Sequence, residues 1–209
     1  MEQEQYLQSL LSEPSRPVKE METYAKENHV PIMEPLGIEF LMQLIRIQKP
    51  TAILEIGAAI GYSALRMVEA NPDCTVTTIE RDEERYNEAL SNIRNMHKEN
   101  QIRVIHGDAL DVKEVVSGHG PFDMLFIDAA KGKYEEFFHL YSPLVKQDGM
   151  IISDNVLFKG YVADDTDAGP RMAKIARKIR GFNEWLVRHP DYHTTIVPIG
   201  DGVAITKKK

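Results

Sequence analysis

The chain has 209 residues, with 25 lysines and arginines against 32 aspartates and glutamates, giving a formal net charge of −7. With 43% hydrophobic and 27% charged residues, the composition is that of a globular protein and excludes a disordered or fibrous chain. The single cysteine, Cys74, excludes an internal disulfide framework and a cysteine-rich zinc module. The sequence lacks an apolar run near the roughly 20 residues that span a bilayer. Its acidic opening, MEQEQYLQSL, is unlike a secretory signal, so we expect a cytoplasmic protein with no membrane partner.

The first 50 residues predict helices, and the pattern then changes to alternating strands and helices. Helices are expected over about 2–11, 17–29 and 34–48. Short apolar runs typical of buried strands cover 51–56, 74–79, 102–106, 122–128 and 150–154. Helical segments lie between these runs, at about 61–71, 82–98, 109–117 and 131–145. This alternation predicts a doubly wound α/β fold whose parallel sheet is covered on both faces.

The C-terminal segment has a different pattern. A long helix over about 168–188 precedes two strand-like runs, 193–199 and 203–207, which a short Gly-Asp-Gly link joins. Such a link between two strands predicts a hairpin. We therefore expect a mostly parallel, seven-stranded sheet with an antiparallel C-terminal hairpin at one edge and extra helices at the N-terminus.

Polar residues follow three successive strands, at the edge where such sheets bind ligands. Gly57 and Gly61 allow a tight turn after the first strand, although Ala59 stands where a dinucleotide site usually has its second glycine. Glu80 ends the second strand and can accept hydrogen bonds from ribose hydroxyls, and Asp108 follows the third and can accept from an adenine amino group. Each alone has a plainer interpretation, as a turn or a solvated loop acid. Together they predict an adenosine ligand without a pyrophosphate, which favours S-adenosylmethionine (SAM) over NAD.

The next two strands end at Asp128 and at Asp154-Asn155. Two carboxylates and an amide oxygen at adjacent strand ends suit a hard cation, Mg²⁺, Mn²⁺ or Ca²⁺, and not zinc. The alternative is that Asp128 caps the following helix and Asp154-Asn155 forms a turn. Lys131 lies three residues after Asp128. A lysine beside a divalent cation can act as a base because the cation disfavours the ammonium form, whereas the alternative is an ordinary surface lysine.

The long C-terminal helix carries a basic face. Its basic residues are Arg171, Lys174, Arg177, Lys178, Arg180 and Arg188. They are expected to point outward, because Met172, Ile175, Ile179, Phe182 and Leu186 form one apolar stripe at helical spacing. The pattern allows either a solvated helix face or a surface that contacts RNA phosphates, chiefly through Arg171, Lys174 and Lys178, with Arg16 and Lys159 as possible additions. Phe158 and Tyr161 either stack on a flipped base or pack within their loop.

Five segments of the chain carry a resemblance to a known family: PLGIEFL (35–41), EIGAAIGYS (55–63), IDAAK (127–131), SDN (153–155) and PIGDGVAI (198–205). They resemble the motifs of the cation-dependent O-methyltransferases, the family of the catechol and caffeoyl-CoA enzymes. The resemblance implies one methyltransferase domain over 1–209, with 1–50 as a helical extension packed on it, and a homodimer. It assigns Asp128, Asp154 and Asn155 to the metal, and Lys131 with Asp128 to catalysis. It also assigns a SAM site lined by Met33, Glu55, Gly57, Gly61, Ser63, Glu80, Asp108, Ala109 and Asp128.

Within this family the chain most resembles the bacterial tRNA 5-hydroxyuridine methyltransferases, which form 5-methoxyuridine at the wobble position. That resemblance implies the tRNA anticodon loop as partner. The plant relatives read D-A-D-K where this chain has Ala130, so a carboxylate near the substrate mouth is absent and the plant substrates are less favoured. Three alternatives remain at this point: methylation of small catechol-like phenols, an NAD-dependent oxidoreductase, and a non-catalytic RNA-binding module.

Overall fold

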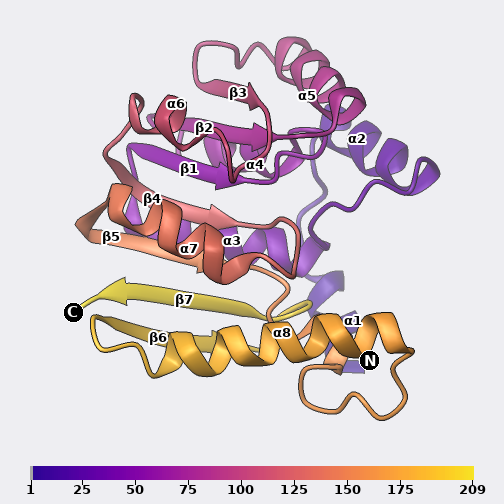
Figure 1. Cartoon of the computed structure of the whole chain (residues 1–209). Coiled ribbons are helices and arrows are strands. Elements are labelled where there is room, and N and C mark those ends of the chain that lie inside the picture. The colour runs from indigo at the N-terminus through magenta and orange to yellow at the C-terminus, as the bar shows by residue number, and fades with distance from the viewer. Residues whose placement is uncertain (1) are drawn as a thin grey trace.

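The computed structural model describes residues 2–209, and its seven strands form one sheet in the order β3-β2-β1-β4-β5-β7-β6 (Figure 1). The strands are β1 (Ala52–Ile56), β2 (Thr75–Glu80), β3 (Ile102–His106), β4 (Phe122–Ile127), β5 (Val145–Ser153), β6 (Tyr192–Val197) and β7 (Val203–Lys208). β1 to β5 pair in parallel, whereas β7 runs antiparallel to both β5 and β6. The predicted doubly wound sheet with an antiparallel C-terminal hairpin at its edge is therefore confirmed.

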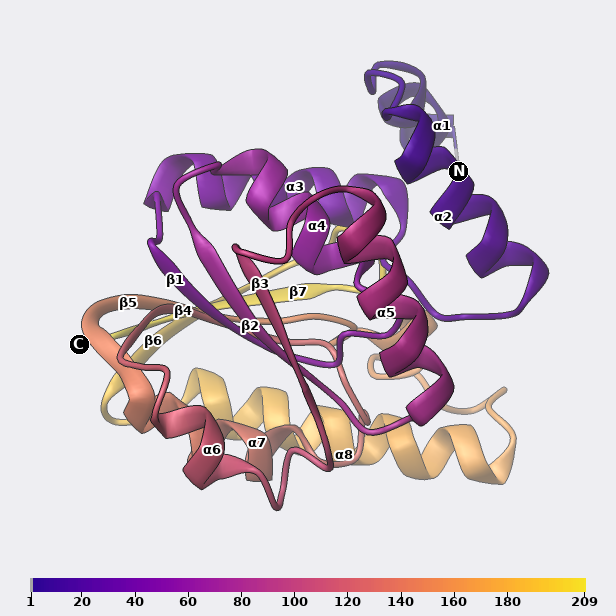
Figure 2. The ribbon, with the colours of Figure 1, turned by 90° about the horizontal axis from the view of Figure 1, so that it is seen from above.

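Helices cover both faces of the sheet. They are α1 (Glu2–Ser9), α2 (Arg16–Glu27), α3 (Pro35–Gln48), α4 (Tyr62–Ala70), α5 (Glu83–Asn95), α6 (Lys113–Ser117), α7 (Tyr134–Tyr141) and α8 (Pro170–Val187). Figure 2 shows α3, α4 and α5 on one face and α6, α7 and α8 on the other. Short 3₁₀ turns occur at Ser142–Leu144 and Phe158–Gly160. Among residues 2–209, no helix is long and apolar enough to cross a membrane.

Two apolar cores lie on the two faces of the sheet. On one face, Ile45 of α3 and Leu65 of α4 are buried against the sheet. On the other, Phe138 of α7 and Phe182 of α8 pack edge to face, with ring centroids 6.5 Å apart. The central strands β1, β2 and β4 and the second half of β5 lie between these cores and are almost entirely buried, which explains their largely apolar sequences.

The strand register brings the polar strand ends to one edge. Ile56 at the end of β1 is level with Ile79 of β2 and Ile127 of β4, and Ile127 is level with Ser153 of β5. The residues that follow these positions therefore emerge side by side. The sheet order also reverses between β1 and β4, because β2 lies on one side of β1 and β4 on the other. Ligands of such sheets bind at this switch point.

Three predicted boundaries were wrong by several residues. The helix expected from 131 begins at Tyr134, because Gly132 disfavours helix and the Lys133 amide donates to the Ala130 carbonyl in a turn. The helix expected from 109 begins at Lys113, because the Asp108 carboxylate accepts a hydrogen bond from the Leu110 amide at 2.9 Å. β5 begins at 145 and not 150, since its first half is polar and part-exposed and gives no apolar run.

Candidate active site

A cleft of about 640 Å³ opens at the carboxyl ends of the parallel strands. Its walls come from the segment before α3, from the loops that follow β1 to β5, from the start of α8 and from the turn between β6 and β7. Of the predicted catalytic, cofactor and metal residues, all except Glu55 and Gly61 line it: Met33, Gly57, Ser63, Glu80, Asp108, Ala109, Asp128, Lys131, Asp154 and Asn155. The structure thus brings together residues that lie up to 122 positions apart in the chain.

The loop after β1 depends on glycine. Gly57 has a φ of +105°, and a Cβ atom added there would lie 2.0 Å from the Asp128 carbonyl oxygen. The loop therefore passes directly against the end of β4, and only glycine permits this approach. Gly61, with a φ of +80°, is the N-cap of α4. Among the predicted cofactor residues, Gly61 is absent from the cleft wall and shapes the loop from behind.

Glu80, the last residue of β2, is buried against this loop and is not a solvated acid. Its Oε2 atom accepts a hydrogen bond from the Ala59 amide at 2.8 Å, and its Oε1 atom accepts from the amides of Arg81 and Asp82 at 2.9 Å each. A carboxylate has about four acceptor sites. Glu80 therefore fixes two loops together and still has capacity to accept from a ribose hydroxyl.

The wall of the cleft near Asp108 contains two arginines that the sequence analysis did not single out. Asp108 holds the Leu110 amide through one oxygen, and its other oxygen lies 3.6 Å from the Arg81 guanidinium. Arg81 and Arg85 both line the cleft. The available signal was their position after Glu80, Arg81 directly and Arg85 in the first turn of α5, because residues that follow a strand end share its edge of the sheet.

Glu55 lies behind the cleft wall. Its side chain is fully buried, accepts a hydrogen bond from the Ser63 hydroxyl, and leaves its Oε2 atom without a partner among the described residues. Burial raises the pKa of Glu55 to about 7, against the lowering effect of the Ser63 hydrogen bond. Its assignment to the cofactor stays a prediction, in which it acts by orienting Ser63.

Asp128, Asp154 and Asn155 meet in one cluster. The Asn155 Nδ2 atom donates to Asp128 Oδ1 at 2.8 Å and to Asp154 Oδ2 at 3.1 Å. Desolvation and the charge of Glu55 raise the pKa of Asp128, and desolvation and the charge of Asp128 raise that of Asp154. The helix-capping alternative for Asp128 is wrong, because Lys133 is the N-cap of α7 and no side chain caps that helix.

The donor set of this cluster fits a hard divalent cation. Among residues 2–209, no group of three His, Cys, Asp or Glu side chains gathers to hold a metal. This cluster instead offers two carboxylates and one amide oxygen, which suit Mg²⁺, Mn²⁺ or Ca²⁺. Desolvation and the charge of a neighbouring carboxylate raise both pKa values, and a bound cation would offset both effects.

Lys131 belongs to this cluster. Its Nζ atom donates to Asn155 Oδ1 at 2.8 Å and lies 5.0 Å from the centroid of the Phe158 ring. Asp201 Oδ2 is 3.9 Å from the same nitrogen. Because α7 begins only at Tyr134, Lys131 lies in the loop over the cleft and not on the exposed face of that helix. Asp201 was interpreted from sequence only as a turn residue, although it lies within the PIGDGVAI segment.

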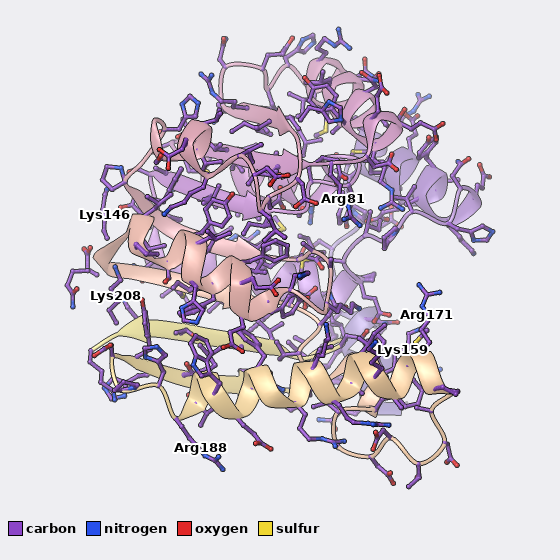
Figure 3. The ribbon with its side chains drawn as sticks, in the orientation of Figure 1. Arg81, Lys146, Lys159, Arg171, Arg188 and Lys208 are labelled. Atoms are coloured by element: carbon purple, nitrogen blue, oxygen red, sulfur yellow. The ribbon has the colours of Figure 1, made fainter. Side chains whose placement is uncertain are left out.

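The basic face of α8 divides into two groups. Arg171, Lys174 and Lys178 are exposed, and none of them forms an ion pair within the described part of the chain. They border the cleft: Met172 and Ile175 line it, and the Lys178 side chain lies over Gly132, next to Lys131. Figure 3 shows Arg171 at the start of the helix and Arg188 at its far end.

Three other basic residues, Arg177, Arg180 and Arg16, have ion-pair partners, whereas Arg188 is exposed and has none among the described residues. Arg177 and Arg180 pair with Asp165 at 3.1 and 3.4 Å, and Arg180 also donates to the Val162 carbonyl at 2.7 Å. The expectation that all six basic residues point outward was therefore wrong for the half-buried Arg180. Arg16 pairs with Glu20 at 2.8 Å.

Two further sequence interpretations change. The apolar stripe of α8 is buried at Ile179, Phe182 and Leu186, but Met172 and Ile175 at its start face the cleft. Phe158 lines the cleft, whereas Tyr161 lies outside its wall and packs on the Phe158 ring, with centroids 6.0 Å apart. Of these two aromatic residues, only Phe158 is therefore placed to contact a substrate in the cleft.

Comparisons with known proteins identify the family of the chain. A protein-family model for O-methyltransferases matches residues 6–209. A catechol O-methyltransferase from Niastella koreensis is 33% identical over 162 residues, covering 76% of this chain and 72% of that protein. The structure of a Staphylococcus aureus protein, provisionally assigned as a caffeoyl-CoA O-methyltransferase, superposes with a TM-score of 0.94 at 38% identity, covering 100% of both chains.

A fourth comparison bears on the cofactor. The O-methyltransferase of Bacillus cereus in complex with S-adenosylhomocysteine (SAH), which is SAM without its methyl group, has a TM-score of 0.85 at 29% identity, covering 99% of this chain and 96% of that one. This chain thus belongs to the O-methyltransferase family. It is a SAM-dependent O-methyltransferase of the caffeoyl-CoA and catechol type, and the oxidoreductase alternative is rejected.

Proposed function

We propose that this enzyme uses SAM and a divalent cation to methylate the 5-hydroxyl of 5-hydroxyuridine at the wobble position of tRNA. The product is 5-methoxyuridine. One observation supports this choice of substrate above others: an exposed basic face borders the cleft of a protein whose net charge is −7. Against an acidic background, cations placed beside a reaction site favour a polyanionic substrate.

Asp128, Asp154 and Asn155 would hold the cation. When bound, it stabilises an anionic acceptor oxygen and fixes its position. In this structure the Asn155 amide points its nitrogen at both carboxylates. To ligate the cation, the amide would turn over and present its oxygen instead. In 5-hydroxyuridine the hydroxyl neighbours the C4 carbonyl, so the acceptor offers two adjacent oxygens, as a catechol does.

Lys131 is the base in this proposal. Methyl transfer forms an oxygen–carbon bond, breaks the sulfur–carbon bond of SAM, and releases the hydroxyl proton. The Lys131 Nζ atom lies in the cleft within hydrogen-bond reach of Asn155, where it can take that proton. The glycine loop and Glu80 hold the donor at the other end of the same cleft, so that alignment contributes to the rate.

The role of the cation can be tested separately from the binding of SAM. Asp154→Ala should abolish cation-stimulated methyl transfer while SAM affinity, measured by calorimetry, changes little. Wild-type enzyme treated with a chelator should lose activity and regain it on addition of Mg²⁺ or Mn²⁺. Full activity in the presence of the chelator would reject the metal site.

The substrate is tested by mass spectrometry of tRNA nucleosides from cells that lack the gene. We expect 5-hydroxyuridine to accumulate and 5-methoxyuridine to disappear, and the purified enzyme should restore the methyl group on this tRNA. The control is an otherwise identical strain that carries the Asp154→Ala gene. Unchanged 5-methoxyuridine in the deletion strain would reject the tRNA substrate.

The basic face is tested by reversing its charge. The triple variant Arg171→Glu, Lys174→Glu, Lys178→Glu should bind tRNA at least tenfold more weakly and show a shallower dependence of affinity on salt. Arg188→Glu is the matched control for the single variant Arg171→Glu, since Arg188 is exposed and is the C-cap of the same helix, about 25 Å from Arg171. Equal effects of these two single variants would show that only overall charge matters.

A second candidate is methylation of small catechol-like phenols, because a catechol enzyme is 33% identical over 162 residues. Assays on a catechol panel beside the hypomodified tRNA discriminate the two. A non-catalytic RNA-binding module would bind tRNA yet transfer no methyl group to either substrate. The homodimer stays a prediction, for which light scattering of the purified protein is the test.

A further inference from the structure

The turn between β6 and β7 is bound to the loop that follows β5. The Asp201 carbonyl oxygen accepts hydrogen bonds from the Leu157 amide at 2.7 Å and the Phe158 amide at 3.2 Å. The Asp201 Oδ1 atom accepts from the Lys159 amide at 3.2 Å. Gly202 completes the contact, since its carbonyl accepts from the Val156 amide at 3.0 Å.

The contact between turn and loop is close and leaves little freedom. A Cβ atom added to Gly202 would lie 2.3 Å from the Leu157 side chain, so the two segments touch at the backbone. Asn155, Phe158 and Lys159 have φ values of 60°, 43° and 56°, a left-handed conformation that residues other than glycine rarely adopt. Such a conformation persists where surrounding hydrogen bonds hold it. Asp201 supplies three of those bonds.

The same aspartate also reaches the candidate base. Its other carboxylate oxygen, Oδ2, is 3.9 Å from Lys131 Nζ, and both side chains are 28% exposed. Lys131 Nζ lies over the Phe158 ring, 5.0 Å from its centroid. The main-chain carbonyl of Asp201 holds the Phe158 amide and its carboxylate holds the next amide, that of Lys159, so residue 201 takes part in two of the three contacts of Lys131. The third is the hydrogen bond to Asn155 Oδ1.

We propose that Asp201 is a positioning residue that holds Lys131 over the cleft, directly through its carboxylate and indirectly through the loop carrying Phe158. This inference rests on the proposed role of Lys131 as the base. Asp201 lies 70 positions from Lys131 in the chain, so the hairpin turn acts as a remote part of the catalytic apparatus.

The alternative is that Asp201 only completes a hairpin turn, and two variants separate these roles. Asp201→Asn keeps an oxygen for the Lys159 amide but removes the charge that faces Lys131. Asp201→Ala removes both. We expect Asp201→Asn to lower kcat on the hydroxylated tRNA about tenfold with little change in KM. SAM affinity and the melting temperature should stay near the wild-type values in this variant.

A double-mutant cycle shows whether Asp201 acts through Lys131. In a Lys131→Ala background, Asp201→Asn should cause no further loss of kcat, because the group it positions is gone. An equal tenfold loss in that background would overturn the proposal and assign Asp201 to the turn alone. The Asp201→Ala variant is included in the same double-mutant cycle only if its melting temperature equals that of the wild type.

A readout without substrate keeps this test independent of the proposed function. Brief labelling with an amine-reactive acetylating reagent, quantified by peptide mass spectrometry, should modify Lys131 several-fold faster in Asp201→Asn than in wild type. Lys133, which pairs with Glu136, serves as the internal reference. If the wild-type enzyme proved inactive on tRNA, faster labelling would still support the positioning role, and unchanged labelling would reject it.

Discussion

Two aspartates at opposite ends of β4 show how one strand serves stability at its start and chemistry at its end. Asp123, near the start, accepts hydrogen bonds from the Thr51 hydroxyl at 2.6 Å and from the amides of Thr51 and Ala52 at 2.8 and 2.9 Å. Lys146 adds an ion pair. Burial alone would raise the pKa of Asp123, but these hydrogen bonds lower it to about 2.

Asp128, directly after β4, is half-buried as Asp123 is, yet its pKa is shifted upward. It accepts one hydrogen bond from the Asn155 amide, and Glu55 repels it. Desolvation is the largest cause of the upward shift at Asp128 and the charge of Glu55 adds to it, whereas at Asp123 the bonds from Lys146, Thr51 and Ala52 outweigh desolvation. An acid whose charge is satisfied stabilises the fold, whereas an acid left unsatisfied is available for a cation.

The largest effect is expected when the charge of Asp128 is removed. Asp128→Asn should lower methyl transfer by about 10³-fold, because the proposed cation loses a carboxylate ligand. In the absence of metal the same variant should melt about 2–4 °C higher at pH 7. The sign follows from linkage: a folded-state pKa above the unfolded value means that ionisation opposes folding as pH rises, and asparagine does not ionise.

Asp123→Asn is the matched control for that experiment, because it makes the same chemical change on the same strand. It should leave kcat within about twofold of wild type and should lower the melting temperature. If both variants lost stability and neither lost activity, the functional distinction between the two ends of the strand would be disproved.

A second prediction concerns the backbone that joins the cofactor loop to the end of β4. Gly57→Ala should lower the free energy of unfolding by about 3 kcal/mol, because its Cβ meets the Asp128 carbonyl and its φ is left-handed. SAM affinity should fall as well. Gly181→Ala is the contrasting control: no atom lies within 4 Å of its added Cβ, so α8 should gain about 0.5–1 kcal/mol in urea unfolding.

The sequence predicts one side of this comparison better than the other. The strand-end residues Gly57, Glu80 and Asp128 could be predicted because each directly follows an apolar run, and parallel strands share one edge. Asp123 could not, since its partner Thr51 precedes β1 and its partner Lys146 lies in β5, far apart in the chain. Their meeting depends on the three-dimensional fold and leaves no periodic signal.

The same limit applies within the site. Asp201 was seen only as part of a hairpin turn, because local sequence predicts the turn but not the loop against which it packs. Similarly, helical periodicity placed Arg180 on the outer face of α8. The structure turns it to Asp165 and the Val162 carbonyl, both in the preceding loop. Local sequence patterns predict helices, strands and turns, whereas contacts between loops far apart in the chain depend on the three-dimensional fold.

A third prediction uses pH to test how Asp123, near the start of β4, stabilises the fold. Asp123→Asn should lose about 2 kcal/mol of unfolding free energy at pH 7, the contribution of hydrogen bonds to a charged group. The folded-state pKa of about 2 lies below the ordinary 3.8. Its contribution to stability is therefore complete above about pH 5 and is lost as pH falls from 3.8 towards 2. The difference between wild type and variant in urea unfolding should shrink over that range, and a constant difference would assign the effect to packing.

The smallest effects are expected from two buried tyrosines behind the cleft. The Tyr134 hydroxyl donates to the Asp154 carbonyl at 2.8 Å, and the Tyr141 hydroxyl donates to the Ala109 carbonyl at 2.6 Å. Replacing either by phenylalanine removes one buried hydrogen bond and should cost about 1 kcal/mol in thermal unfolding.

The functional consequences of these two variants should differ, because the tyrosines support different halves of the cleft. Tyr134→Phe loosens the segment that carries Asp154, so it should raise the Mg²⁺ concentration needed for half-maximal activity about threefold while SAM affinity is unchanged. Tyr141→Phe loosens the segment that carries Ala109, so it should weaken SAM binding by a similar factor without changing the Mg²⁺ requirement. Identical effects on both ligands would mean that the cleft responds as one rigid unit, and the division into a cation half and a cofactor half would then have no energetic basis.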